Sequence, residues 1–194
     1  MLEGQIKRGT GETIRAVIWL CDLRGFTWLS ETLPRDALID LLNSYFGPMC
    51  DAVAAQGGEI LKFIGDAMLA IFPIQGGAQK TCMAALSAAE TAQAALADEN
   101  QRRHALGLPQ IDYGLALHVG DVMYGNIGSD TRLDFTVIGP AVNLTARIES
   151  LRRQLGRTLL LSSDFAEASG SATNSLGRFA LRGVAVEQEI FVPA

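Results

Sequence analysis

The sequence has little cysteine and histidine, and the few residues of each kind are not arranged as a binding framework. Its three cysteines, Cys21, Cys50 and Cys82, are far apart, odd in number and form no CxxC pair. This excludes a disulfide scaffold and favours a reducing cytoplasm, so we expect three small buried apolar side chains. The two histidines, His104 and His118, lack zinc-site spacing, and we expect His118 to be a packed or turn residue.

Long hydrophobic runs are also absent. No apolar segment approaches the roughly 20 residues that a membrane-spanning helix needs, so we expect no membrane insertion by this segment. The first residues, MLEGQIKRGTGE, lack the apolar core of a signal peptide. They look like the remnant of a linker over residues 1–12, and we therefore expect the chain to be a piece of a larger protein.

Positive charge is scarce as well. The formal net charge of -5 argues against a broad nucleic-acid-binding face, although a local positive pocket remains possible. The 194 residues, 48% of them hydrophobic and 20 of them glycine, fit one soluble globular domain with a substantial core and many turns. We assign residues 13–194 to that domain.

Hydrophobic patterning predicts an α+β fold. The apolar run Thr13–Leu23 indicates a buried strand, and a hairpin is expected to turn at Gly65 and Asp66, between EILKFIG and AMLAIFP. Further strands are expected at residues 111–120, 121–128, 132–139, 158–162, 177–183 and 188–193, and helices at 34–56, 78–105, 140–155 and 164–168. Hairpins in this order imply a mixed or antiparallel sheet with helices packed on it.

Two aspartates end apolar runs in similar settings. Asp22 follows a strand and Asp66 stands at a hairpin tip, and for either residue alone a turn is the simpler explanation. Two such tips in one sheet can meet, and two carboxylates there would repel each other unless a cation lay between them. Mg²⁺ suits such a pair, with the Leu23 carbonyl in place to help. The following RGFT turn offers backbone N–H groups that suit phosphate, so the corner favours a nucleoside triphosphate carried with metal ions.

A second group of polar residues lies in TVIGPAVNLTARIE. Asn143 and Arg147 are four residues apart on a predicted helix and project from one face. An arginine beside an amide could stabilise charge on a phosphoryl group, but spacing alone favours a solvent-facing Arg147 that pairs with Glu149 or another acid. Lys62 and Thr136 each precede a short apolar stretch that ends in glycine. The alternative for Lys62 is a side chain that snorkels from an edge strand.

Three motifs in order, DLRGFTWLSE, GGEILKFIGDAMLAIF and FTVIGPAVNLTARIE, closely resemble the catalytic domain of class III nucleotidyl cyclases. The match runs from about Ala16 to Pro193, and three separated motifs are far more specific than one. The resemblance implies a class III cyclase homology domain with a ferredoxin-like α+β core. It also implies that two domains pair head to tail and share each active site. One chain carries both half-sites here, so a homodimer with two equivalent sites is implied.

The resemblance implies a role for each residue that matches a motif. Asp22, Asp66 and the Leu23 carbonyl resemble the ligands of two Mg²⁺ or Mn²⁺ ions per active site. The other implied roles are a triphosphate-binding turn at Gly25, Phe26 and Thr27, purine reading by Lys62 and Thr136, and ribose orientation with transition-state stabilisation by Asn143 and Arg147. Two positions depart from the family pattern: Pro140 replaces a usual Asp or Asn, and Arg182 stands where a phosphate-binding lysine is usual.

The pair that reads the base favours ATP as substrate. Lys62 can donate to adenine N1 while the Thr136 hydroxyl accepts from the 6-amino group. Guanine would set its N1–H against the Lys62 donor, and such mismatches cost about 1–3 kcal/mol. Guanylate-type members usually place an acid at the position of Lys62. Threonine at position 136 resembles the class IIIb subgroup, which implies bicarbonate stimulation.

The expected reaction is therefore conversion of ATP to cyclic AMP and pyrophosphate by two-metal catalysis, in signal transduction under an upstream regulatory domain. Three alternative functions fit the sequence less well. Lys62 disfavours a guanylate cyclase, and the presence of both aspartates with Asn143 and Arg147 disfavours a catalytically silent nucleotide-binding dimer. GGEIL does not supply the acidic hairpin motif of a diguanylate-type synthase.

Overall fold

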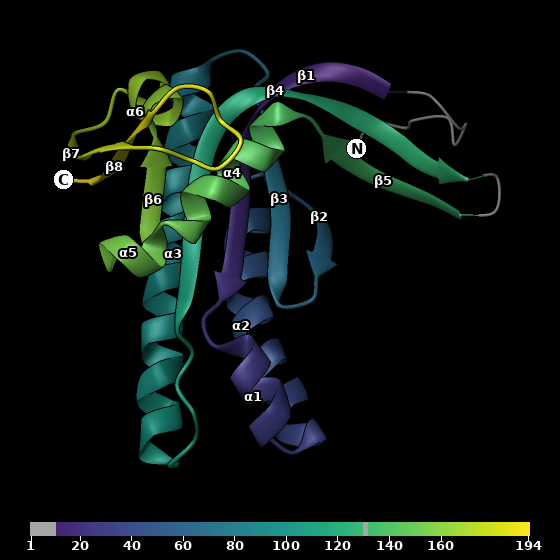
Figure 1. Ribbon diagram of the computed structural model, residues 1–194. Helices are drawn as coiled ribbons and strands as arrows, with labels where there is room; N and C mark the ends of the chain where they lie inside the picture. The colour runs from purple at the N-terminus through teal and green to yellow at the C-terminus, as the bar shows by residue number, and fades with distance from the viewer. Residues whose placement is uncertain (1–10, 130–131) are drawn as a thin grey trace.

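The computed structural model describes residues 11–129 and 132–194 of the chain. The linker remnant expected at residues 1–12 thus lies almost entirely outside the described residues. The described part forms one sheet that carries helices on both faces (Figure 1). None of these helices is long and apolar enough to cross a bilayer.

In the described residues, eight strands build one mixed sheet, the kind of sheet that the sequence patterning predicts. They are β1 (Gly11–Leu23), β2 (Glu59–Ile64), β3 (Ala67–Pro73), β4 (Tyr113–Ser129), β5 (Arg132–Ile138), β6 (Leu159–Ser162), β7 (Thr173–Phe179) and β8 (Gln188–Pro193). Their order across the sheet is β2-β3-β1-β4-β6-β8-β7, with β5 paired to β4. β4 and β6 run parallel, and the other described pairs are antiparallel.

The described residues also form six helices, which pack on this sheet. They are α1 (Phe26–Thr32), α2 (Arg35–Ala55), α3 (Ala78–Ala105), α4 (Pro140–Ser150), α5 (Arg152–Leu155) and α6 (Ser163–Ser169). Side chains alternate along β1, so Val17, Trp19 and Cys21 face α2 and α3 in the largest hydrophobic cluster. Leu29 of α1 and Phe165 of α6 join the same cluster.

The other face of the sheet carries α4. Ala16 and Ile18 of β1 pack there with Ala141 of α4. Farther along α4, Ile148 packs with residues of β6 and β8 in a third cluster. Asp22 is also an even-numbered residue of β1, so alternation places its side chain on the α4 face.

Some predicted boundaries are wrong. The two strands predicted over residues 111–128 are one strand, β4, because β1 and β5 pair along it past Gly120 and Gly125. Gly120 does not interrupt the strand. It allows α4 to pack closely on β4, since a Cβ there would clash with Ala141 of α4. The strand predicted at 177–183 is β7, which begins and ends about four residues earlier and leaves Arg182 in the following turn. The single helix predicted at 140–155 is divided into α4 and α5 at Leu151.

Candidate active site

Asp22 and Asp66 meet at one corner of the sheet. β1 and β3 pair with Cys21 opposite Met68, which places Asp22 beside the hairpin turn that holds Asp66. Burial raises the pKa of Asp66 to about 7, and a side-chain hydrogen bond with Asp22 and the charge of Asp22 add to this rise. The corner is therefore unfavourable for two bare negative charges, and a cation would relieve that repulsion.

The donor set at this corner fits a magnesium-like ion better than zinc. Within residues 11–129 and 132–194, no three or more His, Cys, Asp or Glu side chains gather as a metal-binding group. Structural zinc needs four protein ligands and catalytic zinc three, whereas Mg²⁺ is bound by one or two carboxylates with waters and substrate phosphates. Asp22, Asp66 and the adjacent Leu23 carbonyl match the second pattern.

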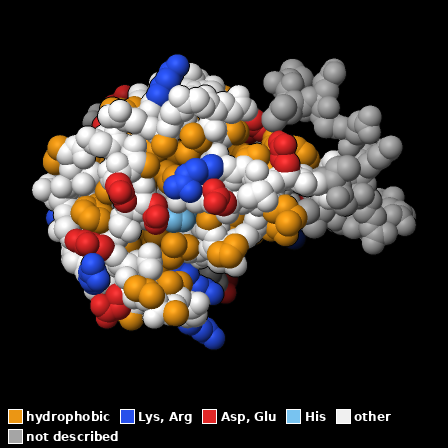
Figure 2. Space-filling model, turned by 90° about the horizontal axis from the view of Figure 1, so that it is seen from above, with side chains coloured by type: hydrophobic (Ala, Val, Ile, Leu, Met, Phe, Trp, Pro, Cys, Tyr) orange, Lys and Arg blue, Asp and Glu red, His pale blue; other side chains and the backbone are white. Residues whose placement is uncertain are grey.

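Asn143, Arg147 and Arg182 line a different region, a cleft of about 920 Å³ at the other end of β1. Arg15, His118, Asp121 and Asp164 contribute further polar groups. Figure 2 shows basic, acidic and histidine side chains gathered on this face. Asp22, Asp66 and Lys62 all belong to the described part of the chain, and none of them lines this cleft.

Arg147 does not pair with Glu149, the alternative that its spacing favoured. Glu149 instead binds Arg152, three residues on, with 2.5 Å between Arg152 Nε and Glu149 Oε1. Arg147 is exposed in the cleft. The i,i+3 spacing of Glu149 and Arg152 was a visible sequence signal for this pair, but sequence reasoning did not use it.

Lys62 and Thr136 lie on neighbouring parts of the sheet, with an acid that sequence reasoning missed. A register shift in β2 between Ile60 and Lys62 marks a bulge, a device that re-aims side chains. Lys62 Nζ lies 3.9 Å from Asp134 Oδ2. Asp134 stands two residues before Thr136 on β5, and the period of a strand puts both on one face. The buried Thr136 hydroxyl has no hydrogen-bond partner among the described residues.

His118 is a packed residue, as expected. Its Nδ1 lies 2.8 Å from the Ser162 hydroxyl, and that oxygen also accepts from the Phe165 N–H at the start of α6. The Ser162 hydroxyl therefore joins the buried ring of His118 to the start of α6. Burial lowers the pKa of His118, and the neutral ring suits this position.

The turn after Asp22 is fastened to the loop between α3 and β4. The Arg24 N–H donates to the Asp112 carbonyl at 2.7 Å, and Arg24 Nη1 lies 3.1 Å from the Asp112 carboxylate. Asn100 of α3 holds the same loop through two hydrogen bonds with the Ile111 backbone. The Gly25 backbone is left-handed, with φ of 71°, and begins α1 directly.

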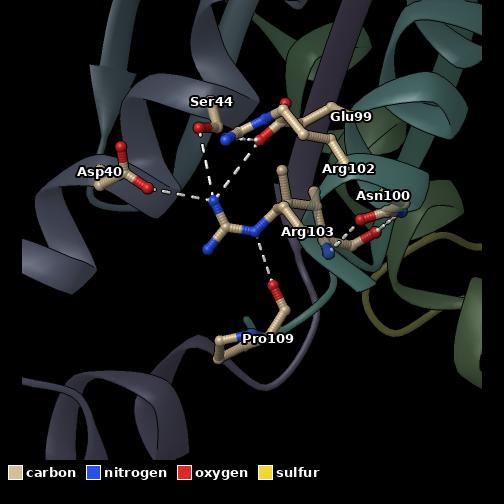
Figure 3. A network of polar contacts seen from close by, with 8 residues as sticks. Asp40, Ser44, Glu99, Asn100, Arg102, Arg103 and Pro109 are labelled. Atoms are coloured by element: carbon tan, nitrogen blue, oxygen red, sulfur yellow. Dashed lines mark hydrogen bonds and ion pairs between the residues drawn. The ribbon is translucent and has the colours of Figure 1, made fainter. Parts of the chain in front are cut away.

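A buried arginine anchors the start of this loop (Figure 3). Arg103 Nε donates to the Pro109 carbonyl at 2.6 Å, and its Nη1 contacts Asp40 and Ser44 of α2. Arg103 is 1% exposed, so these partners compensate its buried charge. Both main helices are thereby joined to the loop that holds the turn beside Asp22.

The family model described as the adenylate and guanylate cyclase catalytic domain matches residues 12–188. A protein named adenylate cyclase from Anabaena cylindrica is 39% identical over 161 residues, which cover 81% of this chain and 31% of that protein. An uncharacterized protein of Mycobacterium tuberculosis, Rv1319c, is 33% identical over 187 residues, or 94% of this chain and 34% of that protein. The chain thus spans about a third of the length of these relatives.

Two solved structures extend the comparison to three dimensions. The adenylyl cyclase CyaB from P. aeruginosa superposes with a TM-score of 0.85 at 30% identity, covering 94% of each chain. The guanylyl cyclase Cya2 superposes with a TM-score of 0.82 at 35% identity, covering 93% of this chain and 92% of that one. Because the second structure is that of a guanylyl cyclase, overall similarity does not decide between adenine and guanine as the base that this chain binds.

Proposed function

Because the chain belongs to the adenylate and guanylate cyclase catalytic domain family, we propose that it converts ATP to 3′,5′-cyclic AMP and pyrophosphate. We assign this activity to residues 13–194. We assign residues 1–12 to the remnant of a linker that follows an upstream regulatory domain, and we place the protein in the cytoplasm. The observation that carries the choice of ATP is the set formed by Lys62, Asp134 and the Thr136 hydroxyl, which has no hydrogen-bond partner among the described residues.

Lys62 and Thr136 read the base. Thr136 Oγ1 is a buried polar atom without a described partner, and such an atom costs free energy until a ligand satisfies it. The adenine 6-amino group supplies a donor to that oxygen while Lys62 donates to N1. The Asp134 carboxylate, with Oδ2 3.9 Å from Lys62 Nζ, would orient the ammonium toward the base.

Asp22, Asp66 and the Leu23 carbonyl would hold the metal ions. Bound there with the triphosphate, Mg²⁺ or Mn²⁺ would lower the pKa of the ribose 3′-hydroxyl and neutralise charge on the phosphates. The carboxylates orient this end of the nucleotide. From the family motif we assign the triphosphate to the turn of Gly25, Phe26 and Thr27, and a further phosphate contact to Arg182, whose fork binds phosphate differently from a lysine.

Asn143 and Arg147 act from the other half-site. Asn143 orients the ribose, and the Arg147 guanidinium stabilises the negative charge that develops on the α-phosphoryl group as the 3′-oxygen attacks. Within one chain these two residues line the cleft from which Asp22 and Asp66 are missing. We therefore propose a homodimer in which the acidic corner of one protomer and the α4 cleft of its partner close around one ATP.

Product formation from ATP and GTP, in Mg²⁺ and in Mn²⁺, tests this function. We expect cyclic AMP as the main product, and we expect Lys62→Glu to move the preference toward GTP by about tenfold or more, as each mismatch of about 1–3 kcal/mol implies. Cyclic GMP as the main wild-type product would favour the second candidate, a guanylate cyclase, which the similarity to Cya2 supports. Unchanged ATP selectivity in Lys62→Glu would contradict the assigned base-reading residues, and no product from either nucleotide would indicate a silent module.

A further inference from the structure

One buried ion pair has no part in the chemistry proposed above. Glu149, near the end of α4, and Arg152, the first residue of α5, have side chains only 9% and 7% exposed. Arg152 Nε donates to Glu149 Oε1 at 2.5 Å. A buried ion pair is weak evidence for stability, because desolvation offsets much of the attraction. Its position is therefore more informative than its strength.

The pair lies directly over Gly114 of β4. A Cβ placed on Gly114 would overlap Arg152 Cδ and Glu149 Oε1, far closer than real side chains approach. Only glycine leaves room for both side chains on this strand. Arg152 and Glu149 therefore rest on the backbone of β4 at this one residue.

Gly114 is the register partner of Asp22. The two residues face each other across the β1–β4 ladder, where partners stand about 4.5–5.5 Å apart between Cα atoms and point to the same face. Gly114 has no side chain of its own to lie beside Asp22. The ion pair, which lies over Gly114, fills that place instead. Arg152 and Glu149 are consequently the described side chains that wall the acidic corner on the β4 side.

The charges of the pair matter at such a short range. Glu149 alone would add a third negative charge beside Asp22 and Asp66, and Arg152 alone would repel a cation from them. When Glu149 and Arg152 are paired, their charges nearly cancel. The charge of the corner is then set by Asp22 and Asp66.

We propose that the Glu149–Arg152 ion pair keeps the charge of each partner from acting on a metal ion at Asp22, and thereby sets the affinity of the corner for divalent metal. This inference rests on the proposed metal-binding role of Asp22 and Asp66. It assigns no contact with the nucleotide to either residue of the pair.

Binding of Mn²⁺ tests the inference without turnover. Free and bound Mn²⁺ are measured by electron paramagnetic resonance without nucleotide, so that no triphosphate competes for the ion. Glu149→Gln frees the Arg152 charge beside Asp22, so we expect affinity for Mn²⁺ to fall about threefold to tenfold. The double variant Glu149→Gln with Arg152→Gln removes both charges and is expected to return to within about twofold of wild type. Glu90→Gln, an equal charge change on the exposed side of α3, serves as the control and should leave affinity unchanged.

The outcomes separate this inference from the proposed function. Mn²⁺ binding that is absent in wild type, or that survives in Asp66→Asn, would refute the metal site itself. Binding that is lost in Asp66→Asn but unchanged in a folded Glu149→Gln would refute only the role of the ion pair. A double variant that binds as weakly as Glu149→Gln would show that shape and not charge matters, against the proposal. Circular dichroism checks folding; if neither variant folds, the pair is a structural element and the proposal is wrong.

Discussion

Replacing Asp66 with asparagine is expected to abolish cyclase activity while making the metal-free domain more stable near pH 8. The activity falls because the corner loses one of two carboxylates for the metal. The stability rises because a partly buried charge is removed and its repulsion from Asp22 disappears. Burial is the main cause that raises the pKa of Asp66 from 3.8 to about 7, and the hydrogen bond with Asp22 and the charge of Asp22 add to the rise.

The sign of the pH effect follows from this shift. Between about pH 4 and pH 7 the folded protein keeps a proton on Asp66 that the unfolded chain has lost. The folded state therefore binds more protons, and the stability of the metal-free wild type falls as pH rises through this window. Asparagine cannot ionise, so this decline should be absent in Asp66→Asn. Mg²⁺ should restore stability to the wild type but not to the variant.

Thermal unfolding from pH 4 to pH 8, in EDTA and then in Mg²⁺, measures these effects. Each 1 kcal/mol of relieved repulsion should raise the Tm by about 2–4 °C in a domain of this size. Asp51→Asn, an exposed change on α2, is the matched control and should alter neither activity nor the pH profile. A variant that is less stable than wild type at pH 8 in EDTA would contradict the account of the carboxylate pair.

Replacing Arg147 with alanine is expected to lower kcat by about 10²- to 10³-fold and to change KM for ATP by only a few-fold. A guanidinium aimed at charge that develops in the transition state adds little to ground-state binding, and loss of one such donor typically has this size of effect. Arg147→Lys keeps the charge but not the planar fork, so it should recover only part of the rate.

Steady-state kinetics with ATP in saturating Mg²⁺ separates the two constants. Arg178→Ala, which removes an exposed arginine of β7, provides the control and should behave as wild type. A large rise in KM at unchanged kcat would mean that Arg147 binds ATP equally in the ground state and the transition state. That result would remove the transition-state role assigned to it.

Local chemistry in the sequence predicted the acidic corner well. Gly65 and Asp66 between two apolar runs specify a hairpin, and the apolar run before Asp22 specifies the strand beside it. Both rules concern residues close in sequence, and the sheet then brings the two tips together. The same kind of rule failed for β4, because pairing with β1 and β5 outweighs the local tendency of Gly120 to interrupt a strand.

The residues that support the site were not predictable in the same way. Asp134 is a supporting residue only because β5 returns alongside Lys62, and Gly114 matters only because α5 sets Arg152 over it. Both relations join segments far apart in sequence, for which neither period nor spacing carries a signal. The Arg103 network is a further example, since its partner Asp40 lies 63 residues away.

Mixing two inactive proteins, Asp66→Ala and Arg147→Ala, tests the shared site most directly. Random exchange of protomers puts half of the chains in mixed dimers, each with one intact site, so activity should return to about a quarter of the wild-type level. Recovery near that level is the predicted result. Mixed dimers demonstrated by differential tagging that remain inactive would contradict the account, because each chain would then build its own site.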